Sequence, residues 1–126
     1  MAKEKYVQEY SFNSSQKVLF NRLSTAGGLN EWFADNVRVQ GKIYTFEWDG
    51  SEQKAEMVNK KDMKYVRFHW LDEEDEKTYF EFKLNVDELT GDLAIIVTDF
   101  AEPDEIKDAR ELWDSQISEL RQILGS

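Results

Sequence analysis

The chain has 126 residues, no cysteine and a formal charge of −10, from 16 lysine and arginine residues against 26 aspartate and glutamate residues. Without cysteine it has no disulfide, no thiolate metal ligand and no cysteine nucleophile, and a single histidine argues against a zinc site. The negative charge opposes binding to nucleic acid and to anionic lipid surfaces, so we expect neither as a partner. A chain of this length is predicted to form one domain over residues 1–126.

Hydropathy also restricts where the protein is expected to act. No apolar run approaches the roughly 20 residues that a membrane-spanning helix requires, so we expect no membrane insertion. The first ten residues are charged and alternating, unlike the apolar core of a signal peptide. The absence of cysteine suits a reducing compartment. We therefore expect a cytoplasmic protein.

The first third of the chain predicts one strand followed by two short helices. Residues 5–12 alternate in polarity, as a half-buried strand does. Residues 13–15 supply N-cap side chains for a helix that contains the apolar residues of 18–23. The glycine pair 27–28 is predicted to end this helix, and the apolar spacing within 29–33 predicts a second short one.

The middle of the chain predicts strands separated by turns. Asp49-Gly50 is a strong signal for a two-residue hairpin turn, and Gly41 and Gly91 lie in two further turns. Every connection is short, so neighbouring strands are expected to pair as an antiparallel meander. The predicted strands are 37–40, 44–48, 51–58, 65–71, 78–89 and 93–100.

The end of the chain, residues 104–124, predicts one long amphipathic helix. A single long helix that follows a sheet is expected to lie across it and to bury its apolar face there. About 21 residues at 1.5 Å each give a rod of roughly 30 Å. The apolar residues recur at spacings of three and four, namely Ile106, Ala109, Trp113, Ile117, Leu120 and Leu124.

Alternation predicts which strand residues face this helix. Trp113 and Ile117 are expected opposite them, with Trp32 and Phe33 closing one end. Two interpretations of this aromatic density remain open: the rings fill the space between sheet and helix, or they line a ligand cavity. The predicted inward set is Tyr44, Phe46, Trp48, Val66, Phe68, Trp70, Phe80, Phe82, Leu84 and Val86.

The sequence offers little catalytic apparatus. His69 shares the outward phase of its strand with Arg67, so we expect an exposed sheet residue rather than a general base. There is no Gly-x-Ser-x-Gly segment and no glycine-rich phosphate loop. Among the acids Asp99 is singled out because it lies near the end of an apolar strand, where burial would raise its pKa. We nevertheless expect a capping or turn role for it. We therefore expect no catalytic residue, no metal and no cofactor.

One acidic run, residues 72–76, has two interpretations. Blocks of like charge are usually solvated, so the run is predicted to be a hairpin loop. It lacks the glycine bend of a calcium-binding loop. Docking of a basic partner is the alternative.

The order of strand, two short helices, six strands and long helix resembles the helix-grip fold of the START-like superfamily (SRPBCC). This group includes proteins like the birch-pollen allergen and homologues of the activator of heat-shock ATPase. The sequence is most similar to small bacterial START-like domains related to the activator group, through segments 18–23, 29–33 and 112–120. The resemblance covers essentially the whole chain. It implies an α+β fold in which a strongly curved antiparallel sheet of about seven strands wraps around the terminal helix.

The resemblance implies two classes of function. The first is a non-enzymatic protein that binds a hydrophobic, lipid-like small molecule, with a biological role that the sequence does not assign. The second is a protein-interaction or co-chaperone-like domain similar to the activator group, and an enzyme such as a cyclase or hydrolase ranks behind both. We expect a monomer or a weak dimer. The candidate ligand-binding residues are Phe46, Trp48, Phe68, Trp70, Phe80, Phe82, Trp113 and Ile117.

Overall fold

Seven strands form one antiparallel sheet in the computed structural model, which describes residues 3–125. Their order across the sheet is β1-β7-β6-β5-β4-β3-β2, so β1 and β2 are its two edges and the sheet does not close. The strands are β1 (Glu4–Phe12), β2 (Asn36–Gln40), β3 (Ile43–Trp48), β4 (Ser51–Lys61), β5 (Tyr65–Trp70), β6 (Phe80–Val86) and β7 (Leu93–Ala101). The helices are α1 (Gln16–Ser24), α2 (Ala26–Trp32) and α3 (Ile106–Leu124), with a 3-10 turn η1 (Pro103–Glu105) before α3.

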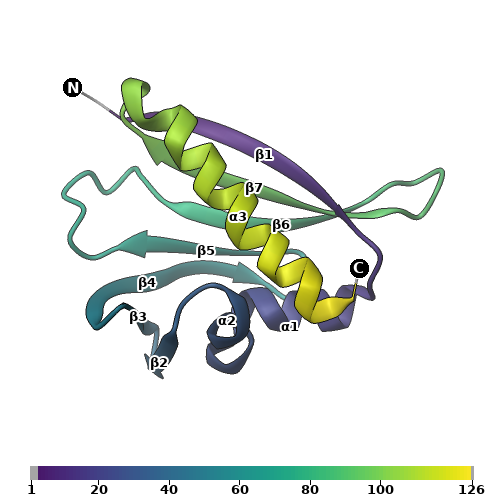
Figure 1. The fold of residues 1–126 in the computed structure, drawn as a ribbon, viewed down its shortest axis with the longest axis horizontal. Coiled ribbons are helices and arrows are strands. Elements are labelled where there is room, and N and C mark those ends of the chain that lie inside the picture. Colours follow the sequence, from purple (N-terminus) through teal and green to yellow (C-terminus); the bar gives the residue numbers. More distant parts are fainter. Residues whose placement is uncertain (1–2, 126) are drawn as a thin grey trace.

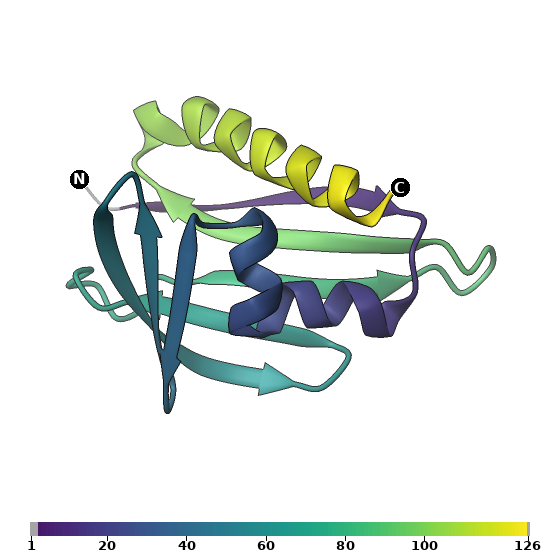
Figure 2. The same cartoon turned by 60° about the horizontal axis from the view of Figure 1, so that its bottom comes forward.

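All three helices lie on one face of the sheet, and the sheet curves around them (Figures 1 and 2). α3 crosses the sheet diagonally, as its apolar stripe predicts, and Trp113, Ile117 and Leu120 are buried beneath it. The other three residues of the stripe pack against the same core while partly exposed. The meander and the helix-grip arrangement predicted from the sequence are confirmed.

The junction of α1 and α2 differs from the prediction. α1 begins at the expected cap, where the Ser15 side chain accepts a hydrogen bond from Val18 N at 3.1 Å. It ends at Ser24, because Thr25 starts α2 by accepting a bond from Gly28 N at 2.9 Å. The prediction that the glycine pair ends α1 is therefore wrong. Gly28 lies within α2, where an added Cβ would come within 2.6 Å of Arg22 Cα.

Two strand boundaries also move. The hairpin at Asp49 and Gly50 is confirmed, with φ of 49° and 83° as a two-residue turn requires. β4 continues past the predicted end to Lys61, and its register with β5 shifts between Met57 and Asn59. β6 is shorter than predicted. Val86, expected to face inward, is 40% exposed, because the hairpin that follows it extends beyond the helices.

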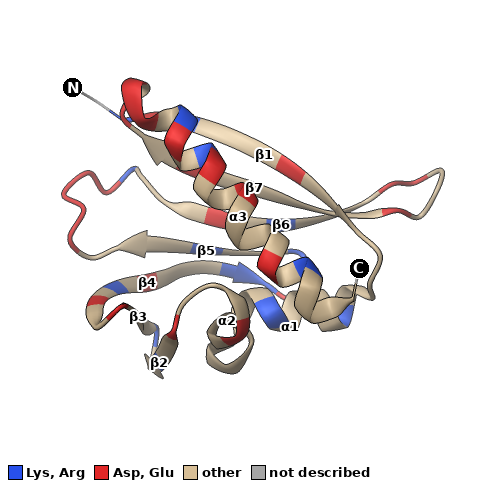
Figure 3. Ribbon diagram, viewed as in Figure 1, with Lys and Arg blue, Asp and Glu red and all other residues tan. Residues whose placement is uncertain are grey.

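Charged residues are frequent on α3 and in the loops (Figure 3), and most of those on α3 are exposed. On the outer face of the sheet Arg67 bonds to Glu81 at 2.8 Å and stacks over the ring of Tyr79 at 3.9 Å. The outward phase predicted for these residues is thus confirmed. Among residues 3–125 no helix has both the length and the apolar composition to cross a membrane.

Candidate functional site

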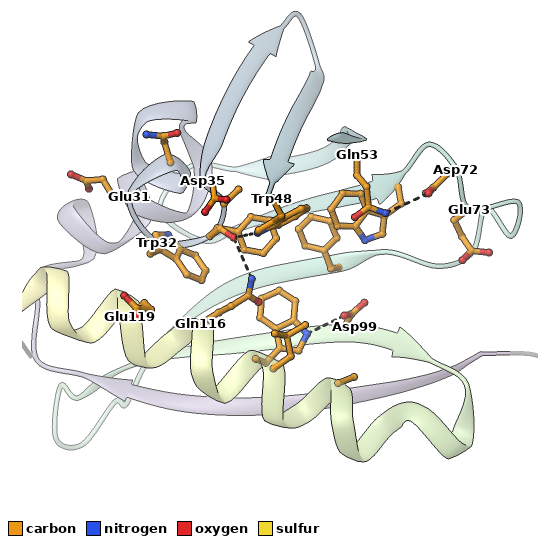
Figure 4. A pocket seen from close by; sticks show the side chains of 18 of the residues that line it. Glu31, Trp32, Asp35, Trp48, Gln53, Asp72, Glu73, Asp99, Gln116 and Glu119 are labelled. Carbon is orange, nitrogen blue, oxygen red and sulfur yellow. Dashed lines mark hydrogen bonds between the residues drawn. The ribbon is translucent and has the colours of Figure 1, made fainter. Parts of the chain in front are cut away.

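The inner face of the sheet is covered unevenly, which leaves a cleft. α3 lies mainly against β1, β7 and α2. α1 packs against β5 and β6, whereas β3 and β4 are covered mainly by side chains. A cleft of about 1100 Å³, open to solvent, lies over this half of the sheet (Figure 4).

Large aromatic rings form the floor of the cleft. Phe33 contributes a ring that lies 5.4 Å from that of Trp48 in an edge-to-face contact and 5.9 Å from that of Trp113 in a stacked one. Trp70 and Phe80 pack with their ring centroids 4.9 Å apart. Such pairs hold each other in place, so the floor is a rigid apolar surface.

One backbone carbonyl fixes the orientation of the cleft wall. Phe33 O accepts hydrogen bonds from Trp48 Nε1 at 2.8 Å and from Gln116 Nε2 at 3.2 Å. The carbonyl thereby joins the end of α2 to β3 and to α3 (Figure 4). Trp70 also lines the cleft, and its indole N–H forms no hydrogen bond within residues 3–125.

Asp99 is the acidic group at the base of the cleft. Its carboxylate accepts bonds from Trp113 Nε1 at 3.0 Å and from Tyr6 Oη at 3.2 Å, which joins β7 to α3 and β1. Burial raises the pKa of the Asp99 carboxyl above its ordinary value, and the hydrogen bonds from Phe100 N, Trp113 and Tyr6 only partly oppose this. The expected capping or turn role is wrong, because Asp99 lies inside β7 and holds two side chains. Its raised pKa confirms the effect that burial was expected to have.

The rim of the cleft is strongly acidic. Lys3 is the one basic residue that lines it within residues 3–125, and it forms an ion pair with Glu73. The predicted loop over residues 72–76 is confirmed, but it is not simply solvated, since Asp72 and Glu73 face the cleft. Six acids line the cleft, namely Glu31, Asp35, Asp72, Glu73, Asp99 and Glu119.

The eight predicted ligand-binding residues divide into two groups. Four of them line the cleft, namely Trp48, Trp70, Phe80 and Trp113. The other four do not reach it, because their side chains are fully buried in the core: Phe46, Phe68, Phe82 and Ile117. Both interpretations of the aromatic density therefore describe part of the molecule.

The outer face of the sheet contains the remaining chemical candidate, His69. Its Nδ1 lies 2.8 Å from the backbone oxygen of Thr78, beside Arg67 and Tyr79 in an outward-facing hollow of about 890 Å³. The predicted outward phase is confirmed, but His69 is half-buried rather than exposed. Among residues 3–125 no group of three or more histidine, aspartate or glutamate side chains is arranged to hold a metal ion.

Sequence reasoning missed most of the polar rim. Gln116 and Glu119 lie on α3 next to the apolar stripe, and Asp35 follows α2. These positions are far in sequence from the loop over residues 72–76, and no local pattern predicts that they line the same cleft. Usable signals came from Trp32 and Phe33, the aromatic residues expected to close one end of the core, and from the acidic run over residues 72–76.

Three comparisons with known proteins relate this structure to others. A family model described as a START-like superfamily domain matches residues 1–126. The solution structure of BfR322 from Bacteroides fragilis is 46% identical over 98% of this chain and 92% of that one, with a TM-score of 0.69. A search of curated proteins finds no significant match.

Two more distant solved structures share the fold. The Aha1 dimer from Colwellia psychrerythraea has a TM-score of 0.80 at 17% identity, with 96% of each chain covered. Protein MLL2253 from Mesorhizobium loti has a TM-score of 0.76 at 19% identity, with 97% of each chain covered. At such identities the similarity concerns the fold alone.

Proposed function

The chain belongs to the START-like superfamily, and from this premise we propose that it binds an apolar or amphipathic small molecule in the cleft between α3 and the sheet. The observation that supports this most strongly is the combination of a large open cleft with a floor of indole and phenyl rings. Ligand sites are typically concave, mostly apolar and about 300 to 1000 Å³ in volume. At about 1100 Å³ the cleft is slightly larger than that range.

The exposed rings supply the affinity. Trp48 and Trp70 are partly exposed, whereas Phe33, Phe80 and Trp113 are nearly fully buried and support them. Covering roughly 100 Å² of apolar surface with a ligand would stabilise a complex by about 2.5 kcal/mol before the entropy of association is subtracted. Trp70 adds an indole N–H that forms no hydrogen bond within residues 3–125, and such a donor suits a polar atom of the ligand. The floor is rigid before the ligand arrives, so little ordering is needed on binding.

The test uses native mass spectrometry of freshly purified protein and titration with a hydrophobic fluorescent dye. We expect an extra mass that is lost on denaturation, or dye binding that Trp70→Ala weakens at least tenfold. Tyr79→Ala is the matched control, because this aromatic residue packs on Phe100 at the outer face of the sheet. A bare polypeptide mass together with no dye binding would overturn the proposal.

A second candidate function is interaction with a protein along the edge strand β2. Within residues 3–125 this strand pairs only with β3, so its other edge has unsatisfied backbone groups, and Val39 there is 40% exposed. The Aha1 homologue that shares the fold was solved as a dimer. We infer that Val39→Lys would abolish any self-association measured by sedimentation equilibrium. A single-chain mass at every concentration, and no partner retained from a bacterial lysate, would count against this candidate.

A further inference from the structure

The charges around the cleft narrow the class of ligand, and this inference rests on the proposed function. Six carboxylate side chains line the cleft against one lysine. Two of the six are paired with cations, Glu73 with Lys3 and Glu31 with Arg22. For Asp35, Asp72, Asp99 and Glu119 no ion pair is formed within residues 3–125.

These acids surround the aromatic floor rather than gather at one place. In Figure 4, Glu31 and Glu119 lie at one end of the cleft and Asp72 and Glu73 at the other. Asp99 lies between them, beside Trp113. A molecule on the floor is therefore within reach of negative charge at either end.

Asp99 adds a carboxylate that forms no ion pair within residues 3–125, although the ammonium group of Lys3 acts on it from beyond ion-pair distance. The donors that bond to it from other strands and helices are the hydroxyl of Tyr6 and the indole of Trp113, both neutral. A carboxylate in this setting is stabilised by any cation brought close to it. Beside it, the face of an indole ring attracts a cation through its quadrupole.

We propose that the cleft selects an amphipathic cation, an ammonium group on an apolar body, over neutral and anionic molecules of the same size. The apolar body covers the rings, and the ammonium group lies near the unpaired carboxylates. An anionic headgroup such as a fatty-acid carboxylate meets repulsion from the same side chains.

The experiment compares three probes of equal chain length by calorimetry: octyltrimethylammonium, octanol and octanoate, each below its aggregation concentration. We expect the cation to bind at least tenfold more tightly than octanol, and octanoate to bind more weakly still. Equal affinity for all three overturns the charge selection and leaves the proposed function standing. No binding of any probe overturns both.

Two double variants distinguish the effect of the charges in the cleft from the effect of the net charge of the protein. Asp72→Asn combined with Glu119→Gln removes two unpaired carboxylates of the rim. Glu88→Gln combined with Glu111→Gln removes the same charge from exposed positions outside the cleft. We expect the first variant to weaken binding of the cation at least fivefold and to leave octanol unchanged, with the control within twofold of the natural protein. An equal loss of affinity for the cation in both double variants would overturn the proposed selection by the charges of the cleft.

Discussion

The inner face of the sheet has a closed end and an open end. At the closed end α1, α2 and the second half of α3 meet over the sheet, and Leu19, Leu23 and Leu120 are all 0% exposed. At the open end Trp48 and Trp70 remain partly exposed to the cleft. Both ends are apolar, so composition alone does not distinguish core from cleft.

The closed end and the open end differ in how far helices cover the sheet and in the shape of their side chains. Aliphatic side chains interlock and fill the space beneath α3, where the backbones of three helices approach the sheet. Indole rings are larger, and their N–H groups need partners, which Phe33 O and Asp99 supply for Trp48 and Trp113. The open end is thus held together by hydrogen bonds as well as packing.

Leu120→Ala gives the largest expected effect on stability. A fully buried leucine at the closed end leaves a cavity when truncated, so the free energy of unfolding should fall by about 3 kcal/mol. Chemical denaturation measures this. Dye binding to the cleft should persist, and its complete loss in the folded variant would show that the two ends are not independent.

Gly28→Ala should lower the free energy of unfolding by about 2 kcal/mol, because the new methyl group meets the backbone of α1. Gly27→Ala is the matched control, since nothing lies within 4 Å of the position its methyl group would take. That control should be stabilising by about 0.5 to 1 kcal/mol, from helix propensity. Similar thermal stability in the two variants would contradict the close contact between α1 and α2.

Trp113→Phe tests the hydrogen bonding of the open end. The variant keeps a ring but removes the N–H that bonds to Asp99, which should lower the free energy of unfolding by about 1.5 kcal/mol. Trp70→Phe removes an indole N–H that forms no bond within residues 3–125. Chemical denaturation should show a smaller loss of unfolding free energy for Trp70→Phe than for Trp113→Phe. The reverse order would contradict a stabilising hydrogen bond between Trp113 and Asp99.

Asp99→Asn tests how much the buried charge at the base of the cleft lowers the stability of the folded protein. Burial holds the pKa of Asp99 above its ordinary value, so the folded state binds this proton more readily than the unfolded chain. The stability of the natural protein should therefore fall as the pH rises from about 4 through the raised pKa, on account of this group.

The asparagine variant should lose that part of the pH dependence. Its stability relative to the natural protein should be greatest near pH 7 and should decline as the pH is lowered toward 4. Denaturation midpoints measured across this range provide the check. A constant difference between the two proteins would contradict a raised pKa.

The fold was largely predictable because its signals are local. Alternation in the strands, the Asp49-Gly50 turn and the stripe on α3 each require only neighbouring residues. The glycine pair was misread, because Gly28 is needed for a contact with the backbone of Arg22 in α1, which no local pattern contains.

Only half of the predicted ligand-binding residues line the cleft, because local sequence signals do not show which inward residues a helix covers. The phase of a strand identifies inward residues but does not say how far the terminal helix extends over them. Phe46 and Trp48 share one face of β3, yet Phe46 is 0% exposed and Trp48 reaches the cleft. The acids of the cleft come from α2, α3, β7 and two loops, and only the folded chain brings these together.

The most direct test of a binding cleft at the open end follows the four indole N–H signals by NMR while octyltrimethylammonium is added to the protein. We expect the signals of Trp48, Trp70 and Trp113 to shift with a common saturating dependence on concentration. The methyl signals of Ile117 and Leu120 at the closed end should stay in place. Shifts confined to the outer face around Tyr79, or no saturable shift in the indole signals, would contradict a binding cleft at the open end.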